Sequence, residues 1–181
     1  PNHTPVLISV ANLVPYKDYF TILKALKEIK ETGQDFYYLI LGDGPMRSEL
    51  EATIQKYDLK DNTRIVGNVE NVSDYLKISD IFVHSSKGEG CSNAILEAMA
   101  AGLPIIASNT GGTSEIVTKD NGFLFEYQNA EELQKQLSWC LENKEKCKKQ
   151  GENSLNAIKK HFTISRMMEN YYKIISQISN K

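Results

Sequence analysis

The chain lacks a run of apolar residues long enough to cross a membrane, and no signal peptide is visible. A membrane span needs about 18 or more consecutive apolar residues. The chain also lacks an excess of basic residues, because 21 Lys and Arg are balanced by 23 Asp and Glu for a formal net charge of −2. A nucleic-acid-binding domain usually carries a strongly basic surface. The composition therefore predicts no transmembrane segment and no nucleic-acid partner.

Cysteine is also scarce, with Cys91, Cys140 and Cys147 as the only three in 181 residues. Their number is odd and no CxxC pair occurs, so the sequence supports neither a disulfide framework nor a zinc site. This usage fits a reducing compartment. We therefore expect a cytoplasmic protein, and leave open whether it associates with the inner face of the membrane.

A complete dinucleotide-binding fingerprint is missing as well. Gly42-Asp43-Gly44 begins one, but the position of the third glycine is Arg47, and the loop follows the second predicted strand instead of the first. Asp43 has no second carboxylate near it in sequence that could share a metal ion. We therefore expect neither a redox cofactor nor a bound metal.

Short apolar runs alternate with segments of helical periodicity along the whole chain. The predicted strands are Val6–Ala11, Tyr37–Leu41, Arg64–Val66, Ile81–His84, Ile105–Ser108 and Gly122–Phe125. The predicted helices are Asp18–Glu31, about 45–57, Val72–Ile78, Ser92–Ala101, Ala130–Glu142, Lys144–His161 and Ile164–Ile178. This alternation is typical of βαβ units. It predicts one α/β domain over residues 1–181, with a Rossmann-like parallel sheet covered by helices on both faces.

The segment KGEGCSNAILEAMAAGLPIIASNTGG places Glu89 and Glu97 on either side of a predicted helix start. Paired carboxylates could suggest glycoside hydrolysis, for which the two groups lie about 5 to 9.5 Å apart. Eight helical residues rise about 12 Å, and Glu89 precedes the helix. The pair is therefore too wide to flank one bond, and it is better suited to contact two ends of a longer ligand.

The helix start between these glutamates is suited to bind a phosphate, since its free N–H groups and dipole attract anions. Ser92 or Asn93 could cap it, and Gly90 permits close approach of a ligand to the backbone. A ligand with hydroxyls at both ends and a phosphate between them, such as a nucleoside diphosphate sugar, fits this pattern. Each glutamate alone could equally be an ordinary solvated residue.

Two further residues lie at the carboxyl edge of the predicted sheet. Lys17 follows the first strand and could neutralise a diphosphate, although it could also be a surface lysine at a helix start. His84 ends a strand, so we expect core packing or a hydrogen bond to a loop rather than catalysis.

Three blocks of the sequence resemble the C-terminal, nucleotide-sugar-binding domain of retaining glycosyltransferases of family 4, which have the GT-B fold. These blocks are LILGDGPMRSELEATIQKYDLKDNTRIVGNV, ISDIFVHSSKGEGCSNAILEAMAAGLPIIASNTGGTSEIV and NGFLF. The resemblance extends from Val6 to the last helix. It includes the E-x7-E element formed by Glu89 and Glu97.

The resemblance implies roles for individual residues. Lys17 matches the lysine on the donor diphosphate, Glu89 the glutamate near the donor sugar, and Glu97 the glutamate on the ribose. Asn12 stands where the family usually has an arginine, so one cationic partner of the phosphates is missing. The predicted donor-binding residues are Asn12, Lys17, Gly44, Val69, Glu89, Gly90, Cys91, Ser92, Asn93 and Glu97, with Lys17 and Glu89 also assigned to catalysis.

The resemblance also implies the reaction. The chain would bind the nucleotide-sugar donor, while an absent N-terminal domain would hold most of a carbohydrate or lipid-linked acceptor. The last helix, about 164–178, could pack on that domain. Transfer would retain the anomeric configuration without a metal, in the synthesis of a surface polysaccharide or glycoconjugate. The alternatives are a non-catalytic nucleotide-binding module, suggested by Asn12, and a GT-B nucleotide-sugar epimerase.

Overall fold

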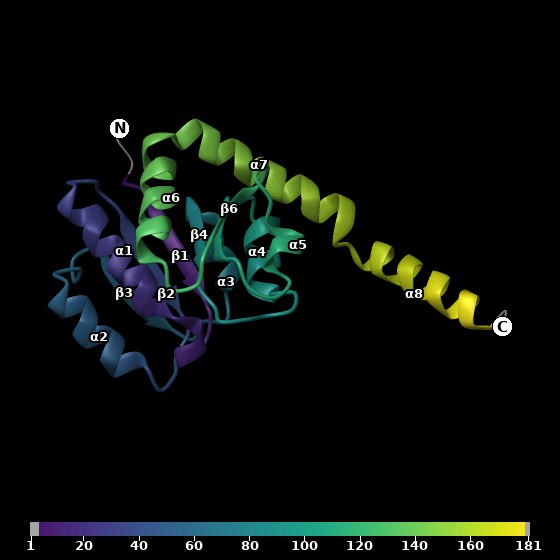
Figure 1. Ribbon diagram of the computed structural model, residues 1–181, viewed down its shortest axis with the longest axis horizontal. Helices are drawn as coiled ribbons and strands as arrows, with labels where there is room; N and C mark the ends of the chain where they lie inside the picture. The colour runs from purple at the N-terminus through teal and green to yellow at the C-terminus, as the bar shows by residue number, and fades with distance from the viewer. Residues whose placement is uncertain (1–3, 180–181) are drawn as a thin grey trace.

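Six parallel strands form one sheet in the computed structural model, which describes residues 4–179 (Figure 1). The strands are β1 Val6–Val10, β2 Tyr37–Leu41, β3 Thr63–Gly67, β4 Ile81–His84, β5 Ile105–Ser108 and β6 Gly122–Phe125. Their order across the sheet is β3-β2-β1-β4-β5-β6, and each neighbouring pair is parallel. This confirms the predicted Rossmann-like α/β class. Residues 1–3 and 180–181 of the predicted domain lie outside the described residues.

Nine helical segments connect or follow these strands in residues 4–179. They are the 3-10 helix η1 Pro15–Lys17 and the α-helices α1 Tyr19–Glu31, α2 Arg47–Lys56, α3 Val72–Lys77, α4 Asn93–Ala100, α5 Thr113–Ile116, α6 Ala130–Glu142, α7 Lys144–His161 and α8 Ile164–Ser179. The predicted strands and long helices are confirmed to within about two residues at either end. η1 and α5 were not predicted, because a segment of three or four residues is too short to show a periodic pattern.

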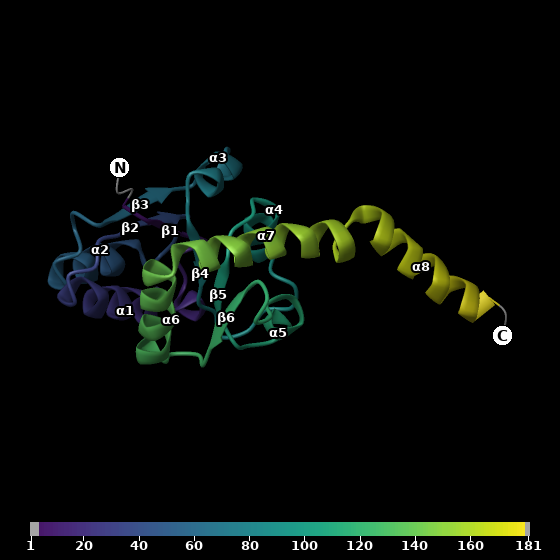
Figure 2. The ribbon, with the colours of Figure 1, turned by 90° about the horizontal axis from the view of Figure 1, so that it is seen from above.

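Helices cover both faces of the sheet, because successive strand residues point to opposite sides. In β1, Leu7 packs in the core beneath α1, α2 and α6, whereas Ile8 packs in the core beneath α3, α4 and the C-terminal half of α7. In β4, Val83 and Phe82 divide between the same two cores. Figure 2 shows the sheet between these two layers of helices. Burial on both sides explains why the strands have nearly continuous apolar sequences.

The strand order reverses direction between β1 and β4, which are neighbours in the sheet but far apart in sequence. β1 connects outward to β2 on one side, and β4 connects outward to β5 on the other. In open α/β sheets, ligands bind at such a switch point, beyond the carboxyl ends of the strands. The loops after β1 and β4 are therefore the first place to look for a site.

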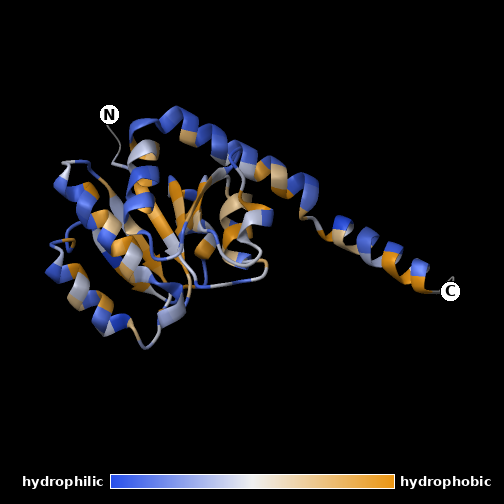
Figure 3. Ribbon diagram, viewed as in Figure 1, coloured by the Kyte–Doolittle hydropathy of each residue, from blue (hydrophilic) through white to orange (hydrophobic). Residues whose placement is uncertain are grey.

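Helix α8 extends away from the rest of the molecule in both views (Figures 1 and 2). In Figure 3 the ribbon of α8 alternates between blue and orange segments. Its exposed large apolar and aromatic side chains are Ile164, Met167, Met168, Tyr171, Tyr172, Ile174, Ile175 and Ile178. None of the described helices combines the length and apolar content needed to cross a bilayer.

Candidate functional site

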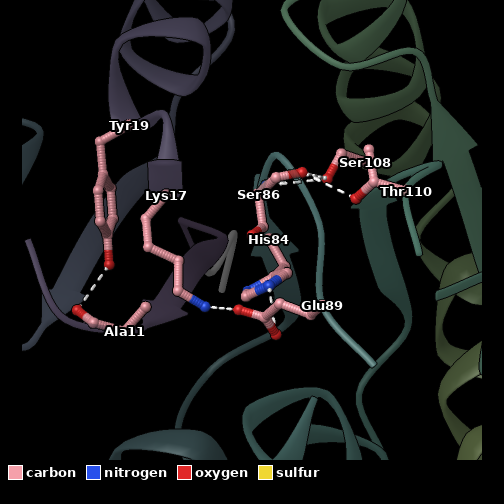
Figure 4. Close-up of polar contacts among 8 residues, drawn as sticks. All are labelled: Ala11, Lys17, Tyr19, His84, Ser86, Glu89, Ser108 and Thr110. Carbon is pink, nitrogen blue, oxygen red and sulfur yellow. Dashed lines mark hydrogen bonds and ion pairs between the residues drawn. The ribbon is translucent and has the colours of Figure 1, made fainter. Parts of the chain in front are cut away.

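Lys17 and Glu89 form an ion pair at the switch point (Figure 4). Lys17 is the last residue of η1, after β1, and Glu89 lies on the loop between β4 and α4. His84, the last residue of β4, places Nε2 3.3 Å from the second carboxylate oxygen, Oε2 of Glu89. The geometry of this contact is not that of a hydrogen bond, and within residues 4–179 the buried Nε2 has no hydrogen-bond partner. The fold thus brings together two residues predicted from the sequence and one that was not assigned to the site.

The three side chains are largely shielded from water. The exposed fraction is 12% for the Lys17 side chain, 17% for Glu89 and 3% for His84. Burial lowers the pKa of Lys17. Burial, together with the nearby charge of Lys17, lowers the pKa of His84 to about 3, so its imidazole is neutral at physiological pH. Charge interactions at this edge are therefore stronger than on an open surface.

A network of hydroxyl groups fixes the start of the loop that carries Glu89. The backbone N–H of Ser86 donates to Oγ of Ser108 at 2.9 Å, and that hydroxyl donates back to the carbonyl of Ser86 at 2.9 Å. The Thr110 hydroxyl donates to the same carbonyl at 2.8 Å. Figure 4 shows these contacts beside the ion pair. The end of β5 therefore anchors the loop after β4.

The loop after β1 is attached to the same segment. The backbone N–H of Lys87 donates to the carbonyl of Tyr16 at 2.8 Å. The Ser85 hydroxyl donates to Oδ2 of buried Asp18 at 3.3 Å. These bonds hold the two loops against each other, and so hold Lys17 close to Glu89.

Two glycines of the β5–α5 loop lie directly against the backbone of the Glu89 loop. The N–H of Gly112 donates to the carbonyl of Glu89 at 2.8 Å. A Cβ at Gly111 would lie 1.9 Å from that same oxygen, and Gly111 has a φ of +55°. A Cβ at Gly112 would lie 2.6 Å from the carbonyl oxygen of Gly90. Only residues without side chains permit this packing.

Helix α4 begins next to this loop and presents its N-terminus at the carboxyl edge. Ser92 is the N-cap residue, as one of the two predicted alternatives, but its buried side chain makes no capping hydrogen bond. The first N–H groups of a helix have no partner within the helix. Cys91 and Asn93 are exposed on either side of Ser92. The backbone N–H groups around residues 91–93 are therefore a candidate anion-binding site, as the sequence predicted.

Asn12 and Val69 line one pocket of about 280 Å³ on the other side of the β1 loop, together with Gly42 and Asn68. Gly44 borders the same loop, since a Cβ there would lie 2.5 Å from the carbonyl oxygen of Leu13. These predicted residues come from three different connections, and the sheet edge brings them together.

Glu97 is separate from the Lys17–Glu89 pair. Its side chain is exposed on α4, and within residues 4–179 it forms no ion pair. The ion pair at the switch point therefore includes Glu89 but not Glu97. In the described part of the chain, no three His, Cys, Asp or Glu side chains are grouped as metal ligands would be.

Sequence reasoning did not identify His84 as a neighbour of Glu89, although its burial was expected. It also did not identify Ser86, Ser108 and Thr110 as loop anchors. A possible signal was the placement of small hydroxyl residues directly after two buried strands, where hydroxyls commonly bond loop backbone.

One family of known proteins matches most of this chain. Residues 1–157 match the model of the family described as glycosyl transferases group 1. The chain belongs to this family. An uncharacterized glycosyltransferase from Haemophilus influenzae is 33% identical over 141 residues, which cover 77% of this chain and 40% of that protein. The amylovoran biosynthesis glycosyltransferase AmsD of Erwinia amylovora is 31% identical over 136 residues, covering 75% and 38%.

Among solved structures, Anabaena Alr3699/HepE in complex with UDP superposes on this group 1 chain with a TM-score of 0.89. The superposition covers 96% of this chain and 49% of that protein, at 22% sequence identity. The likeness confirms the fold, which is that of the Rossmann-like halves of GT-B glycosyltransferases. The chain spans less than half the length of each of these relatives.

Proposed function

We propose that this chain is the donor-binding, C-terminal half of a retaining family 4 glycosyltransferase with the GT-B fold. The complete enzyme would move a sugar from a nucleoside diphosphate sugar to an acceptor held mainly by another domain. The observation that carries this proposal is the meeting of Lys17 and Glu89 at the switch point, beside the N-terminus of α4. The family match and the UDP complex of the Anabaena relative support it.

The donor would lie along the carboxyl edge of the sheet. The N–H groups at the start of α4 and the ammonium of Lys17 would bind the diphosphate, because both attract anions. Glu89 would accept hydrogen bonds from the sugar hydroxyls, and exposed Glu97 from the ribose. Backbone groups at Val69 would meet the base in the pocket of about 280 Å³, and Asn12, which lines the same pocket, would lie near the phosphates.

Transfer would depend mainly on stabilising charge on the departing diphosphate. Lys17 now pairs with Glu89, so donor binding would exchange this partner for a phosphate oxygen. The ammonium would then neutralise the charge that develops as the glycosidic bond breaks. The helix dipole adds to this effect, and the acceptor would attack on the face from which the diphosphate leaves. We expect no metal in this step.

A second function is favoured by one residue. Asn12 is neutral where relatives of this type usually carry an arginine, and its side chain is exposed at the rim of the pocket. A chain with one fewer cation could bind nucleotides without transferring sugar.

For the transferase, we further propose a role in the synthesis of a surface polysaccharide or glycoconjugate. The sequence likeness to the Erwinia amylovoran enzyme supports this role.

Titration calorimetry with UDP-, GDP- and ADP-sugars tests donor binding directly. We expect one nucleotide series to bind, and Glu97→Ala to weaken it by about 1–3 kcal/mol through loss of a charge-assisted hydrogen bond. Glu49→Ala, an exposed glutamate on α2, serves as the matched control and should bind normally. If no nucleotide series binds, the donor-site assignment is wrong. If Glu97→Ala and Glu49→Ala both bind like wild type, the role of Glu97 is wrong.

Turnover separates the enzyme from the non-catalytic module. In the full-length protein, Glu89→Ala should abolish transfer while the fold is retained. A full-length wild-type protein that binds a donor but transfers no sugar to any acceptor offered would favour the binding module.

A further inference from the structure

His84 is held in one orientation by the core of the protein. It is the last residue of β4, and its ring stacks with that of Phe82 on the same face of the strand, with centroids 6.2 Å apart and an interplanar angle of 10°. Phe82 is fully buried against the core beneath α4. The imidazole therefore cannot swing freely, and Nε2 remains directed at the loop that carries Glu89 (Figure 4).

The carboxylate of Glu89 has a different partner on each oxygen. Oε1 pairs with the ammonium of Lys17, and Oε2 lies 3.3 Å from Nε2 of His84. Because burial keeps His84 neutral, its ring has one N–H and one lone pair. If the proton is on Nε2, that N–H can donate to Oε2 of Glu89. If the proton is on Nδ1, the lone pair of Nε2 faces a lone pair of Oε2, which is repulsive. The contact therefore favours the tautomer that carries its proton on Nε2.

The two partners differ in what happens when an anion arrives. Lys17 has a flexible four-carbon side chain, and a diphosphate would attract its ammonium away from Glu89. Without another donor, Glu89 would then be a largely buried carboxylate with no fixed partner, which is unfavourable. His84 cannot leave, because the strand and Phe82 hold it.

We propose that His84 is a positioning residue that fixes Oε2 of Glu89 by donating a hydrogen bond to it. Once the diphosphate draws Lys17 away, Oε1 of Glu89 is free to accept a hydrogen bond from a hydroxyl of the donor sugar. This inference rests on the proposed function and adds a division of labour within the site. The helix start and Lys17 recognise the diphosphate, and the His84–Glu89 pair recognises a hydroxylated sugar ring. His84 itself touches neither the sugar nor the phosphates.

The division of labour predicts a selective loss of affinity. The probes are the sugar nucleotide that the wild-type chain binds most tightly among UDP-, GDP- and ADP-glucose, and the matching nucleoside diphosphate. With His84→Leu, which fills similar space without a donor, the sugar nucleotide should bind about tenfold more weakly and the nucleoside diphosphate within about twofold of wild type. His84→Gln, whose amide can donate, should recover most of the loss. Phe82→Leu is the control for changes in packing, and thermal unfolding of each variant establishes that it is folded.

Equal weakening of both probes by His84→Leu, or no weakening of either, would overturn the proposal. If the wild-type chain binds none of the nucleotides, the proposed function itself fails, and the sugar-positioning role fails with it. A ligand-free measurement separates the two cases. Nitrogen-15 NMR of the histidine side chains should show His84 neutral with its proton on Nε2 at pH 7. A proton on Nδ1 would refute the proposed donation from His84 to Glu89 even where nucleotide binding is intact.

Discussion

Replacing Gly111 with alanine should displace the loop that carries Glu89, although Gly111 is not itself expected to contact the ligand. The new Cβ would lie 1.9 Å from the carbonyl oxygen of Glu89, whereas real Cβ atoms stay at least 3.0 Å from such atoms. The two loops must therefore separate by about 1.1 Å. The φ of +55° is also strained for any residue with a Cβ.

The magnitude follows from these two effects. Left-handed backbone costs an L-residue roughly 1–2 kcal/mol, and loss of the bond from Gly112 N–H to the Glu89 carbonyl costs about 0.5–1.5 kcal/mol. We expect Gly111→Ala to lower the free energy of unfolding by roughly 1.5–3.5 kcal/mol in urea denaturation. A shift of about 1 Å should also weaken binding of a sugar nucleotide, because Glu89 no longer meets the sugar.

Gly88 is the matched control, since it lies on the same loop and a Cβ there meets no atom within 4 Å. Gly88→Ala should change the free energy of unfolding by less than about 0.5 kcal/mol. If Gly111→Ala is as stable as Gly88→Ala and binds the sugar nucleotide equally well, the loop packing does not position Glu89 as described.

Three further predictions concern side chains of the site. Lys17→Gln should weaken nucleoside diphosphate binding by about 1–3 kcal/mol in calorimetry. Lys24 is an exposed lysine on α1, and Lys24→Gln should bind normally. If the two variants bind equally well, Lys17 does not contact the phosphates. The lowered pKa of His84, about 3 against about 6.5 when unfolded, means that the unfolded chain binds more protons between these values. Neutral His84 should therefore make its full contribution to the free energy of unfolding above about pH 6.5. Below that pH the free energy of unfolding should fall by up to about 1.4 kcal/mol per pH unit. In urea denaturation at several pH values, His84→Gln should reduce this dependence of stability on pH, and His161→Gln should not. If neither variant changes the pH dependence, the burial argument is contradicted. Finally, Cys91 is exposed beside the start of α4, so iodoacetamide should label it in the native chain before the two buried cysteines, and a bound sugar nucleotide should slow this labelling, as mass spectrometry would show. If the sugar nucleotide does not change the rate at which Cys91 is labelled, the phosphates do not bind at the start of α4.

The fold could be predicted from the sequence because its strands are buried on both faces. Ile81–His84 and Ile105–Ser108 are short apolar runs with clear ends, and the structure has the same bounds. Gly102 follows α4 with a φ of +80°, and Pro104 directly precedes β5, so these two residues mark the connection before β5. Local signals of this kind are enough for element position.

Contacts between distant residues were harder to predict. The sequence places Lys17 and Glu89 at one edge of the sheet, but it does not show that they pair, or that His84 reaches Glu89. A histidine at the end of a buried strand has the same local pattern whether it meets a loop carboxylate or only apolar neighbours. The strand order and the packing of Gly111 against Glu89 decide between these outcomes, and neither is a local property.

A crystal structure of the chain with its preferred sugar nucleotide tests the central proposal most directly. We predict that the diphosphate lies against the first N–H groups of α4 and Nζ of Lys17, with the sugar at Glu89. The opposite edge of the sheet offers an alternative cavity of about 390 Å³, lined by Cys140, Cys147 and Pro104. A sugar nucleotide bound there, or one at the carboxyl edge whose sugar points away from Glu89, would contradict the account.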